Sequence, residues 1–461
     1  MSPLKRFDIS LLRSKHGTRW KCWDFAVGIT AFCLGFLLTP HRHAIPEAVN
    51  VYAAGILFGA ILMLCSRLCG VPNPGRGPSR YEIITASILA IVLTYLIFAL
   101  LIWFAFFEFY GRYVIGYTIL LSLIGLALPR MVALGVLKAQ PLNVVIYGAG
   151  EKGEAALKRL AKDPHFKVLG FLDNNPIYHG AERFGHPVFG SIHTFGREQL
   201  AYIDVSIVVI AVSARRLMED NARELLELPL AGIEILNLGG FVEHYFKEID
   251  IGFDCPDWFA STPSVPGNPS IFAAKRIIDI AGGVLGLLIS LPLWPLIAIA
   301  IKLDSSGPVL FKQTRVGWHN RPFTIVKFRT MASDAEKNGA QWAEPEDDRV
   351  TRVGKFLRRT RLDELPQFWN VLKGDMALVG PRPERPQFVE GLAKEIPFYE
   401  QRHLVPPGLT GWAQVRYRYG ASKEDAKRKL QFELYYIRHL SLMFDIEILL
   451  RTIPMLAKGS R

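Results

Sequence analysis

The pair Asp363-Glu364 is the part of the chain best suited to chemistry. These two adjacent carboxylates follow three arginines at positions 358, 359 and 361. Carboxylates can act as nucleophiles, bases or ligands of a hard cation, and arginines bind phosphate in a bidentate manner. Pro366 fits the first turn of a helix, where its missing N–H is not needed. We therefore predict a helix that begins at Asp363 as its N-cap, where the helix dipole keeps the carboxylate ionised and attracts phosphate.

Two further strings around this pair contain basic residues that can bind phosphate. Residues 323–331 include Lys327 and Arg329, and residues 374–384 include Arg382 between two prolines that fix its backbone. Each string is weak evidence by itself, because such segments also occur as rigid turns or solvated strand ends. The carboxylate pair by itself equally fits a capped surface helix with solvated charges.

The order of these strings resembles one enzyme family. Residues 307–317 (GPVLFKQTRVG), 357–372 and 407–414 (PGLTGWAQ) extend the pattern on both sides of the carboxylates. Together the strings cover residues 272–461 and resemble the catalytic domain of the monotopic phosphoglycosyl transferases. These bacterial enzymes transfer hexose-1-phosphate to a polyprenyl phosphate. The chain resembles their large form, which has an N-terminal membrane bundle and a Rossmann-like domain.

The resemblance implies a reaction of the EC 2.7.8 type. Hexose-1-phosphate, with glucose or galactose as the hexose, passes from UDP-hexose to undecaprenyl phosphate with release of UMP. The step would initiate exopolysaccharide, O-antigen or capsule synthesis at the cytoplasmic face of the bacterial inner membrane. Because both substrates are anionic, cations must screen the developing charge. The expected phosphate-binding residues are Lys327, Arg329, Arg358 and Arg382.

The family also implies roles for the carboxylate pair. Asp363 is the nucleophile that carries the phosphosugar covalently, and it contacts Mg²⁺, the expected metal. Glu364 is expected to assist as a base toward the lipid phosphate. Membrane lipid is an expected partner. A homodimer and contacts with other polysaccharide-assembly enzymes are both compatible with the sequence.

Composition bounds the classes of protein that the chain can belong to. At 461 residues it is long enough for two or three domains, and half of its residues are hydrophobic, which indicates membrane segments. The formal charge of +12 suits a protein that lies on anionic lipid and handles phosphorylated substrates. No nucleic-acid-binding motif is present, so we expect no nucleic-acid partner. The five cysteines form no CxxC pair, which predicts neither a disulfide nor a zinc site.

The first domain, residues 1–140, is predicted to be a transmembrane four-helix bundle. Each of its four apolar stretches has close to the ~20 residues that a helix needs to cross the hydrocarbon. These stretches are Phe25–Thr39, Val51–Leu68, Ile83–Phe107 and Tyr113–Leu128. Basic residues gather at the N-terminus, in the second loop and after the fourth stretch. The positive-inside rule then places both ends of the bundle in the cytoplasm.

Residues 141–250 alternate between strand and helix patterns, which predicts a small α/β Rossmann-like domain. A buried strand at 143–147 runs into Gly148, Gly150 and Gly153, a GxGxxG turn that opens a helix, and Asp173 follows the next strand. The spacing fits a dinucleotide fingerprint, with the acid as the ribose ligand. The alternative is that the glycines serve only the tight turn and the packing of the fold.

Residues 251–271, which are rich in proline, are predicted to be a linker. The catalytic α/β domain at 272–461 then begins with an apolar helix at 275–303, which has Pro292 and Pro295 in its middle. An interior proline bends a helix, and a complete crossing would place the catalytic residues outside the cell. We therefore predict a re-entrant membrane helix that breaks near residues 290–292 and returns to the same face.

Two other classes of protein compete with the transferase. The Rossmann-like unit is also found in sugar-nucleotide epimerases and dehydratases, but residues 142–250 contain no Tyr-xxx-Lys pair of the kind that those enzymes use. Alternatively, the bundle and the Rossmann-like unit form a regulatory or scaffolding module of a polysaccharide-assembly complex. This second interpretation is compatible with catalysis by the C-terminal domain.

Overall fold

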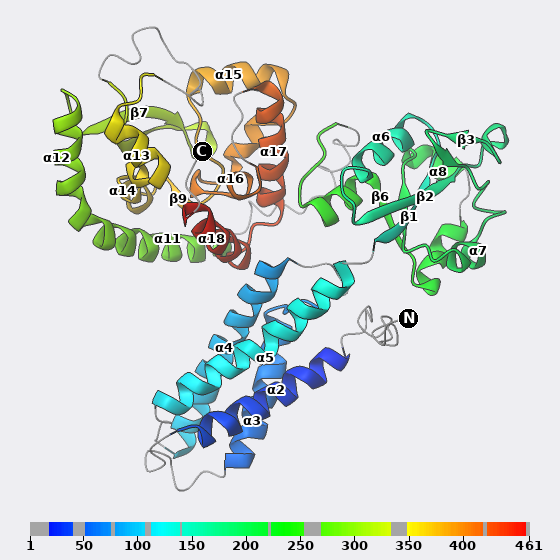
Figure 1. The fold of residues 1–461 in the computed structure, drawn as a ribbon, viewed down its shortest axis with the longest axis horizontal. Coiled ribbons are helices and arrows are strands. Elements are labelled where there is room, and N and C mark those ends of the chain that lie inside the picture. The colour runs from blue at the N-terminus through cyan, green and yellow to red at the C-terminus, as the bar shows by residue number, and fades with distance from the viewer. Residues whose placement is uncertain are drawn as a thin grey trace. The chain divides into compact units, whose positions relative to one another are not determined.

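The computed structural model describes residues 18–39, 51–74, 79–106, 112–138, 141–219, 223–252, 269–332, 348–417 and 422–457. The chain forms two compact units, residues 1–237 and 238–461. The first unit contains a helical bundle and an α/β domain, and the second is the C-terminal domain (Figure 1).

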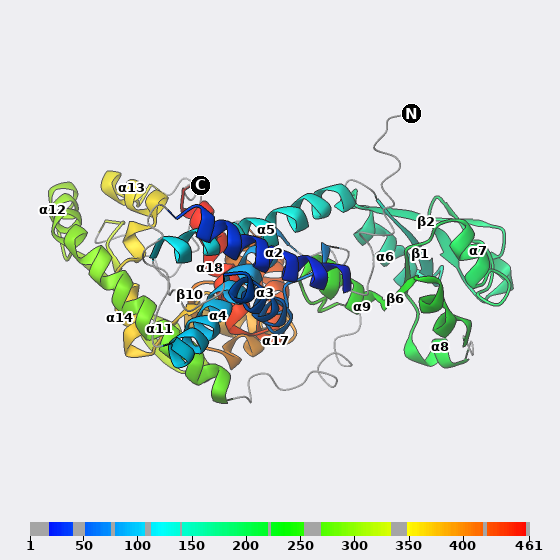
Figure 2. The same ribbon diagram turned by 90° about the horizontal axis from the view of Figure 1, so that it is seen from below.

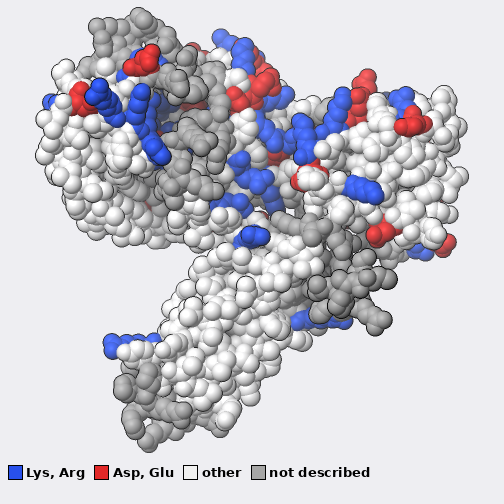
Figure 3. Space-filling model, viewed as in Figure 1, with Lys and Arg blue, Asp and Glu red and all other residues white. Residues whose placement is uncertain are grey.

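The four predicted membrane helices are confirmed as helices. They are α2 (Thr18–Leu37), α3 (Val51–Leu68), α4 (Arg80–Phe106) and α5 (Arg112–Lys138). Phe32, Phe58 and Phe98 form an aromatic core, with ring centroids 5.3 Å apart for Phe32–Phe98 and for Phe58–Phe98. The side of the bundle seen in Figure 3 has charged residues only near its two ends. Five helices of the described chain, these four and a fifth at Pro269–Asp304, are long and apolar enough to cross a membrane.

A buried ion pair joins three of the bundle helices, and sequence patterns did not predict it. Arg130 on α5 and Asp24 on α2 lie 2.7 Å apart, and the Ser66 hydroxyl on α3 donates to the second Asp24 oxygen at 2.7 Å. The Arg130 guanidinium also lies 4.7 Å from the centroid of the Trp20 ring. Charged groups inside apolar bundles are costly unless they are paired. This pair therefore fixes how α2, α3 and α5 align.

The α/β domain has the predicted Rossmann-like fold. Its parallel sheet has the order β2-β1-β5-β6, from strands β1 (Leu142–Tyr147), β2 (Phe166–Leu172), β5 (Ile207–Ile210) and β6 (Glu234–Asn237). The helices are α6 (Glu151–Leu160), α7 (Arg197–Tyr202) and α8 (Ala214–Glu219), and a short β3–β4 hairpin covers Glu182–Pro187. The central strands are buried on both faces, as in a sheet covered by helices and loops.

The C-terminal unit begins earlier than the expected domain boundary. Its first element, α9 (Leu238–Phe241), follows β6 directly and continues into the helical turn η6 (Val242–Phe246). The Rossmann-like domain was predicted to extend to residue 250, whereas the second compact unit starts at Leu238. Most of the predicted linker at 251–271 lies outside the described residues.

The apolar helix of this unit is broken where the prolines predict a break. Helix α11 (Pro269–Ser290) is followed by a 3₁₀ turn at Leu291–Leu293 and by α12 (Trp294–Asp304). The two helices meet at a pronounced bend in both views (Figures 1 and 2). Exposed leucine and isoleucine side chains cover the outer surface of both helices.

The remaining elements contain the strings of the sequence that resemble the enzyme family. A β7–β8 hairpin (Leu310–Val316 and Pro322–Phe328) precedes α13 (Arg352–Thr360) and α14 (Gln367–Lys373). A parallel strand pair then joins β9 (Ala377–Val379) and β10 (Gly408–Thr410). The other helices are α15 (Pro386–Glu395), η11 (Tyr399–Leu404), α16 (Trp412–Arg416), α17 (Lys423–Arg438) and α18 (Leu442–Ala457).

Candidate active site

The two carboxylates lie in a tight turn between α13 and α14. Helix α13 ends at Thr360, and the residue that caps it, Arg361, has a left-handed backbone (φ 57°). A 3₁₀ turn then covers Leu362–Glu364. The prediction that Asp363 is the N-cap of a helix is wrong. Helix α14 begins only at Gln367, after Pro366, and has no side-chain cap. The left-handed residue reverses the chain before α14 can begin, so Asp363 is held by the turn and its packing.

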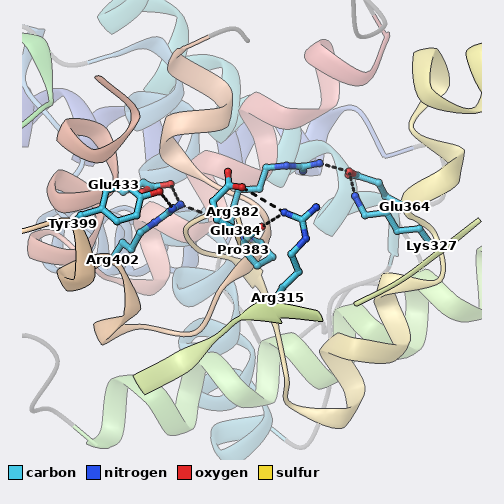
Figure 4. Close-up of polar contacts among 9 residues, drawn as sticks. All are labelled: Arg315, Lys327, Glu364, Arg382, Pro383, Glu384, Tyr399, Arg402 and Glu433. Atoms are coloured by element: carbon cyan, nitrogen blue, oxygen red, sulfur yellow. Dashed lines mark hydrogen bonds and ion pairs between the residues drawn. The ribbon is translucent and has the colours of Figure 1, made fainter. Parts of the chain in front are cut away.

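Glu364 is paired with two cations through one of its oxygens. One carboxylate oxygen accepts from Arg382 Nη2 at 2.7 Å and from Lys327 Nζ at 3.3 Å, and the side chain is only 12% exposed (Figure 4). Burial alone would raise the pKa of Glu364, but Arg382 and Lys327 outweigh it and hold that pKa well below the usual range. Glu364 is therefore ionised throughout the physiological range and holds both cations in place.

Asp363 has the opposite environment. Its side chain is buried, and no group in the described part of the chain donates a hydrogen bond to its carboxylate. Burial and the neighbouring Glu364 charge raise the pKa of Asp363 to about 6, although Lys327, Arg382 and Arg358 oppose the shift. At neutral pH the carboxylate is mostly ionised but poorly solvated. A carboxylate in this state is a better nucleophile and metal ligand than a paired one.

Lys327 is positioned by the helix that follows the carboxylates. The Asn370 side chain on α14 accepts from Val326 N at 3.1 Å and donates to Thr324 O at 2.7 Å. The Asn370 amide thus binds the backbone of β8 on both sides of Ile325 and holds this strand against α14. The strand then places the Lys327 side chain beside Glu364. Burial lowers the pKa of Lys327, and the Glu364 charge opposes that effect.

Arg382 lies in a loop that is held from two sides. Arg402 Nη2 donates to the Arg382 carbonyl oxygen at 2.8 Å, and the same nitrogen pairs with Glu433 at 2.7 Å (Figure 4). On the other side, Arg315 Nη1 donates to Pro383 O at 3.1 Å and lies 3.4 Å from the Glu384 carboxylate. The Arg402–Glu433 pair is almost completely buried. The backbone of Arg382 is therefore fixed by buried charges as well as by its flanking prolines.

The other two predicted cations occupy different places. Arg358 donates from Nε to Thr330 Oγ1 at 2.9 Å, and it is close enough to Asp363 to lower the pKa of that carboxyl. Arg329 is 5% exposed and donates to the carbonyl and hydroxyl oxygens of Ser305, at 2.8 and 2.9 Å. Of the four predicted phosphate-binding residues, Lys327 and Arg382 thus contact the carboxylate pair directly, Arg358 acts on it from nearby, and Arg329 instead fastens the end of α12.

Known proteins resemble this chain over its C-terminal region. The family model described as bacterial sugar transferase matches residues 270–459. An N-acetylgalactosaminephosphotransferase of Aeromonas hydrophila that acts on undecaprenyl phosphate is 50% identical over 42% of this chain and 45% of its own length. An undecaprenyl-phosphate glucose phosphotransferase of Komagataeibacter xylinus is 46% identical over 39% of this chain and 35% of its own. The chain therefore matches less than half the length of these two relatives.

A third relative is matched over most of its length. The UDP-glucose:undecaprenyl-phosphate glucose-1-phosphate transferase of Caulobacter vibrioides is 43% identical over 41% of this chain and 74% of its own. The chain belongs to the bacterial sugar transferase family. A second model, described as a CoA-binding domain, matches residues 67–216, as expected for the large form of this family. Among solved structures, the Rex-family repressor RSP is 23% identical, with a TM-score of 0.20 over 25% of this chain and 52% of its own.

In this sugar transferase, the broken helix is attached to the helix that follows the carboxylates. Arg276 on α11 donates to Val371 O and Leu372 O, both at 2.6 Å, and so satisfies the last carbonyl groups of α14. Gly282, Gly283 and Gly286 face Leu378, Leu372 and Phe368. An added methyl group at any of these glycines would lie within 2.5–2.8 Å of those side chains. Helix α11 therefore packs on α14 without intervening space.

Both ends of the broken helix are also anchored in the C-terminal unit of this transferase. Lys275 pairs with Asp445 on α18 at 2.6 Å, and Asp279 accepts from Leu378 N at 2.8 Å. At the far end, Asp304 accepts from Val353 N at 2.9 Å. The whole apolar segment thus begins and ends on the same domain.

In the glycine turn of the Rossmann-like domain, Asp173 accepts hydrogen bonds from residues of the same domain. Gly148 has a φ of 112°, and a methyl group on Gly153 would collide with Gly148 O, so both glycines are required by the turn itself. Gly150 has open space around it. Asp173 accepts from Ala149 N at 2.8 Å through one oxygen, and the other oxygen accepts from Asn175 N and Arg216 at 2.9 Å. Both carboxylate oxygens are therefore occupied by this domain's own donors.

Several residues that hold the candidate active site together were not predicted from the sequence. Asn370 fastens the strand that carries Lys327, Arg402 and Arg315 fasten the loop that carries Arg382, and Glu433 pairs with Arg402. None of these four residues was predicted. Arg402 and Glu433 stand 20 and 51 positions after Arg382 in the sequence, with no spacing that connects them. Arg315 lies within the string at residues 307–317. Its position near the end of a strand was the only feature of the sequence that could have indicated its role.

Proposed function

We propose that the protein transfers a hexose-1-phosphate from a UDP-sugar to undecaprenyl phosphate, with release of UMP. The observation that supports this most directly is the contrast between the two carboxylates, since Asp363 is buried without a donor whereas Glu364 holds Lys327 and Arg382. The three relatives are named for glucose and N-acetylgalactosamine transfer, so UDP-glucose and UDP-N-acetylgalactosamine are the donors to test first. Their names give no support for galactose.

In the first step, an Asp363 oxygen attacks the phosphorus atom that bears the sugar. The bond from this phosphorus to the bridging oxygen breaks, UMP leaves with that oxygen, and an acyl phosphate joins Asp363 to the sugar phosphate. Charge accumulates on the bridging and peripheral oxygens, where Lys327 and Arg382 can stabilise it. Because both cations are already fixed by Glu364, little reorganisation is needed during the reaction.

In the second step, a phosphate oxygen of undecaprenyl phosphate attacks the same phosphorus atom. The bond to Asp363 breaks, which restores the carboxylate and yields the diphosphate-linked sugar. A base is most effective when its pKa is near the operating pH, and the strongly lowered pKa of Glu364 fits that role poorly. We therefore assign Glu364 the role of holding Lys327 and Arg382, in place of the base predicted from the family.

Mg²⁺ fits this site only as a partner of the donor substrate. No group of three or more histidine, cysteine, aspartate or glutamate side chains in the described residues could hold a metal by itself. Mg²⁺ is commonly held by one or two carboxylates together with substrate phosphates, and the unpaired Asp363 carboxylate can supply such a ligand. When bound, the ion would neutralise charge on the diphosphate oxygens.

The broken helix suits a substrate that lies in a membrane. Both ends of α11–α12 are anchored in one domain, and the outer surface is apolar, which supports a re-entrant segment that enters one leaflet and returns. Such a segment would place Asp363 near the phosphate headgroups, while the sugar nucleotide arrives from water. With the positive-inside bundle, we place this face in the cytoplasm of the bacterial inner membrane.

The proposal is tested with purified protein and the donor alone. Each UDP-sugar is added without lipid acceptor, and we expect release of at most one UMP per protein molecule together with a phosphosugar adduct on the peptide that contains Asp363. Addition of undecaprenyl phosphate should then remove the adduct. Glu395→Gln, which changes a solvent-exposed ion pair with Lys423, is the matched control. An adduct on another residue, or UMP release that always requires both substrates, contradicts the covalent route.

A further inference from the structure

Residues 238–251, which we name the clasp segment, are part of the C-terminal unit although neither family model includes them. The models match residues 67–216 and 270–459. The clasp segment nevertheless contributes Ile249 and Ile251 to the main core of the C-terminal unit, where they are 2% and 5% exposed. The clasp segment is therefore packed into the C-terminal unit and is not merely a linker between two domains.

Several polar contacts attach the clasp segment to α16 and α17. Three use its backbone: Trp412 Nε1 donates to Lys247 O at 2.8 Å, Arg416 Nη2 donates to Phe246 O at 3.1 Å, and Ile249 N donates to Gln431 O at 3.0 Å. Ion pairs add to these contacts. The buried carboxylate of Glu248 pairs with Arg428 at 2.7 Å, and Glu243 lies 3.0 Å from Arg438 Nε.

Helix α17 also carries the residue that supports Arg382. Glu433 lies between Gln431 and Arg438 on this helix, and it pairs with Arg402, which donates to the Arg382 carbonyl oxygen. Trp412 gives a second connection, since it follows β10, and β10 pairs with the strand that leads into Gly380–Arg382. Both elements that contact the clasp segment therefore also fix the Arg382 loop.

We propose that the clasp segment is a positioning element of the active site, which holds α17 and Trp412 so that Arg382 stays against Glu364. The pair of the buried Glu248 carboxylate with the partly exposed Arg428 is its main polar anchor. The inference rests on the proposed function for its kinetic readout. If the wild-type protein releases no UMP, the proposed function fails, whereas the structural readout below still tests the clasp segment.

The kinetic test is a double-mutant cycle in the full-length protein. We expect Glu248→Gln to lower kcat/KM for UMP release about fivefold to tenfold in the wild-type background and less than about twofold in the Arg382→Lys background. Arg428→Lys, which keeps the charge, should retain more activity than Arg428→Gln. Glu154→Gln, which alters a surface pair with Lys158 in the Rossmann-like domain, is the matched control and should change neither background.

The structural test is hydrogen exchange at the Arg382 loop. Peptides that cover residues 380–385 should exchange faster in Glu248→Gln than in wild type, and the Glu154→Gln control should match wild type. An equal loss of activity in both Arg382 backgrounds would show a general effect on folding and would overturn the proposal. Unchanged exchange at residues 380–385 in Glu248→Gln would also overturn it.

Discussion

The Rossmann-like turn and the catalytic turn each place an aspartate beside groups that can bind phosphate, but the two aspartates have opposite surroundings. Asp173 gives both of its oxygens to Ala149, Asn175 and Arg216. Asp363 receives no hydrogen bond from the described residues, whereas Lys327 and Arg382 both donate to Glu364. The comparison separates an aspartate that stabilises a fold from one that remains available to a substrate.

The largest effect is expected from removing the available carboxylate. Asp363→Asn should reduce UMP release by at least about 1000-fold, because the nucleophile is lost. The same change should stabilise the protein at pH 7.5 by about 1–3 kcal/mol without metal, because a buried and unpaired charge is removed. Activity assays and thermal unfolding measure the two effects. A variant that is both inactive and less stable would indicate that Asp363 is a structural residue like Asp173.

The next effect concerns the carboxylate that holds the cations. Glu364→Gln should lower UMP release about 100-fold, because Lys327 and Arg382 lose the anion that fixes them. It should also lower the melting temperature, since it leaves two partly buried cations without this counter-charge. The matched control is Glu395→Gln. Retained activity with normal stability would show that the cations are held by other groups.

The pH dependence sharpens the comparison. The pKa of Asp363 is raised to about 6, so the rate of the donor half-reaction should fall as pH drops below about 6. In the folded protein Asp363 binds a proton more tightly than in the unfolded chain, so its ionisation reduces stability as pH rises from about 4 to 6. The difference in unfolding free energy between wild type and Asp363→Asn should therefore grow over this range and stay constant above it. A difference that does not change with pH would place the pKa near its ordinary value.

The smallest effect on catalysis is expected in the Rossmann-like turn. Asp173→Asn should leave UMP release within about twofold of wild type, because Asp173 serves its own domain. It should destabilise that domain by about 1–3 kcal/mol, since the turn amides and Arg216 lose a buried acceptor charge. Limited proteolysis and thermal unfolding would measure the loss. A large loss of turnover without loss of stability would point to a ligand at this turn that catalysis requires.

Local patterns in the sequence predicted the elements well. Apolar length predicted the four bundle helices, the prolines predicted the break at 291–293, and strand alternation predicted the parallel sheet. The N-cap role of Asp363 was predicted incorrectly, because the left-handed conformation of Arg361 depends on how α13 and α14 pack. Contacts between distant segments, such as Asp24–Arg130, Arg402–Glu433 and Glu248–Arg428, have no local signature. These contacts depend on how the segments pack in the folded chain, so they could not be predicted from the sequence alone.

Glycines line the contact between α11 and α14, so the apolar helix packs closely against the helix that follows Asp363. A bilayer that is thicker or thinner than the hydrophobic length of a helix makes the helix tilt. Tilting of α11 would then be passed to α14 with little loss, so lipid acyl-chain length should tune the turnover rate. The proposed transfer to undecaprenyl phosphate would thereby respond to the thickness of the membrane that holds the acceptor.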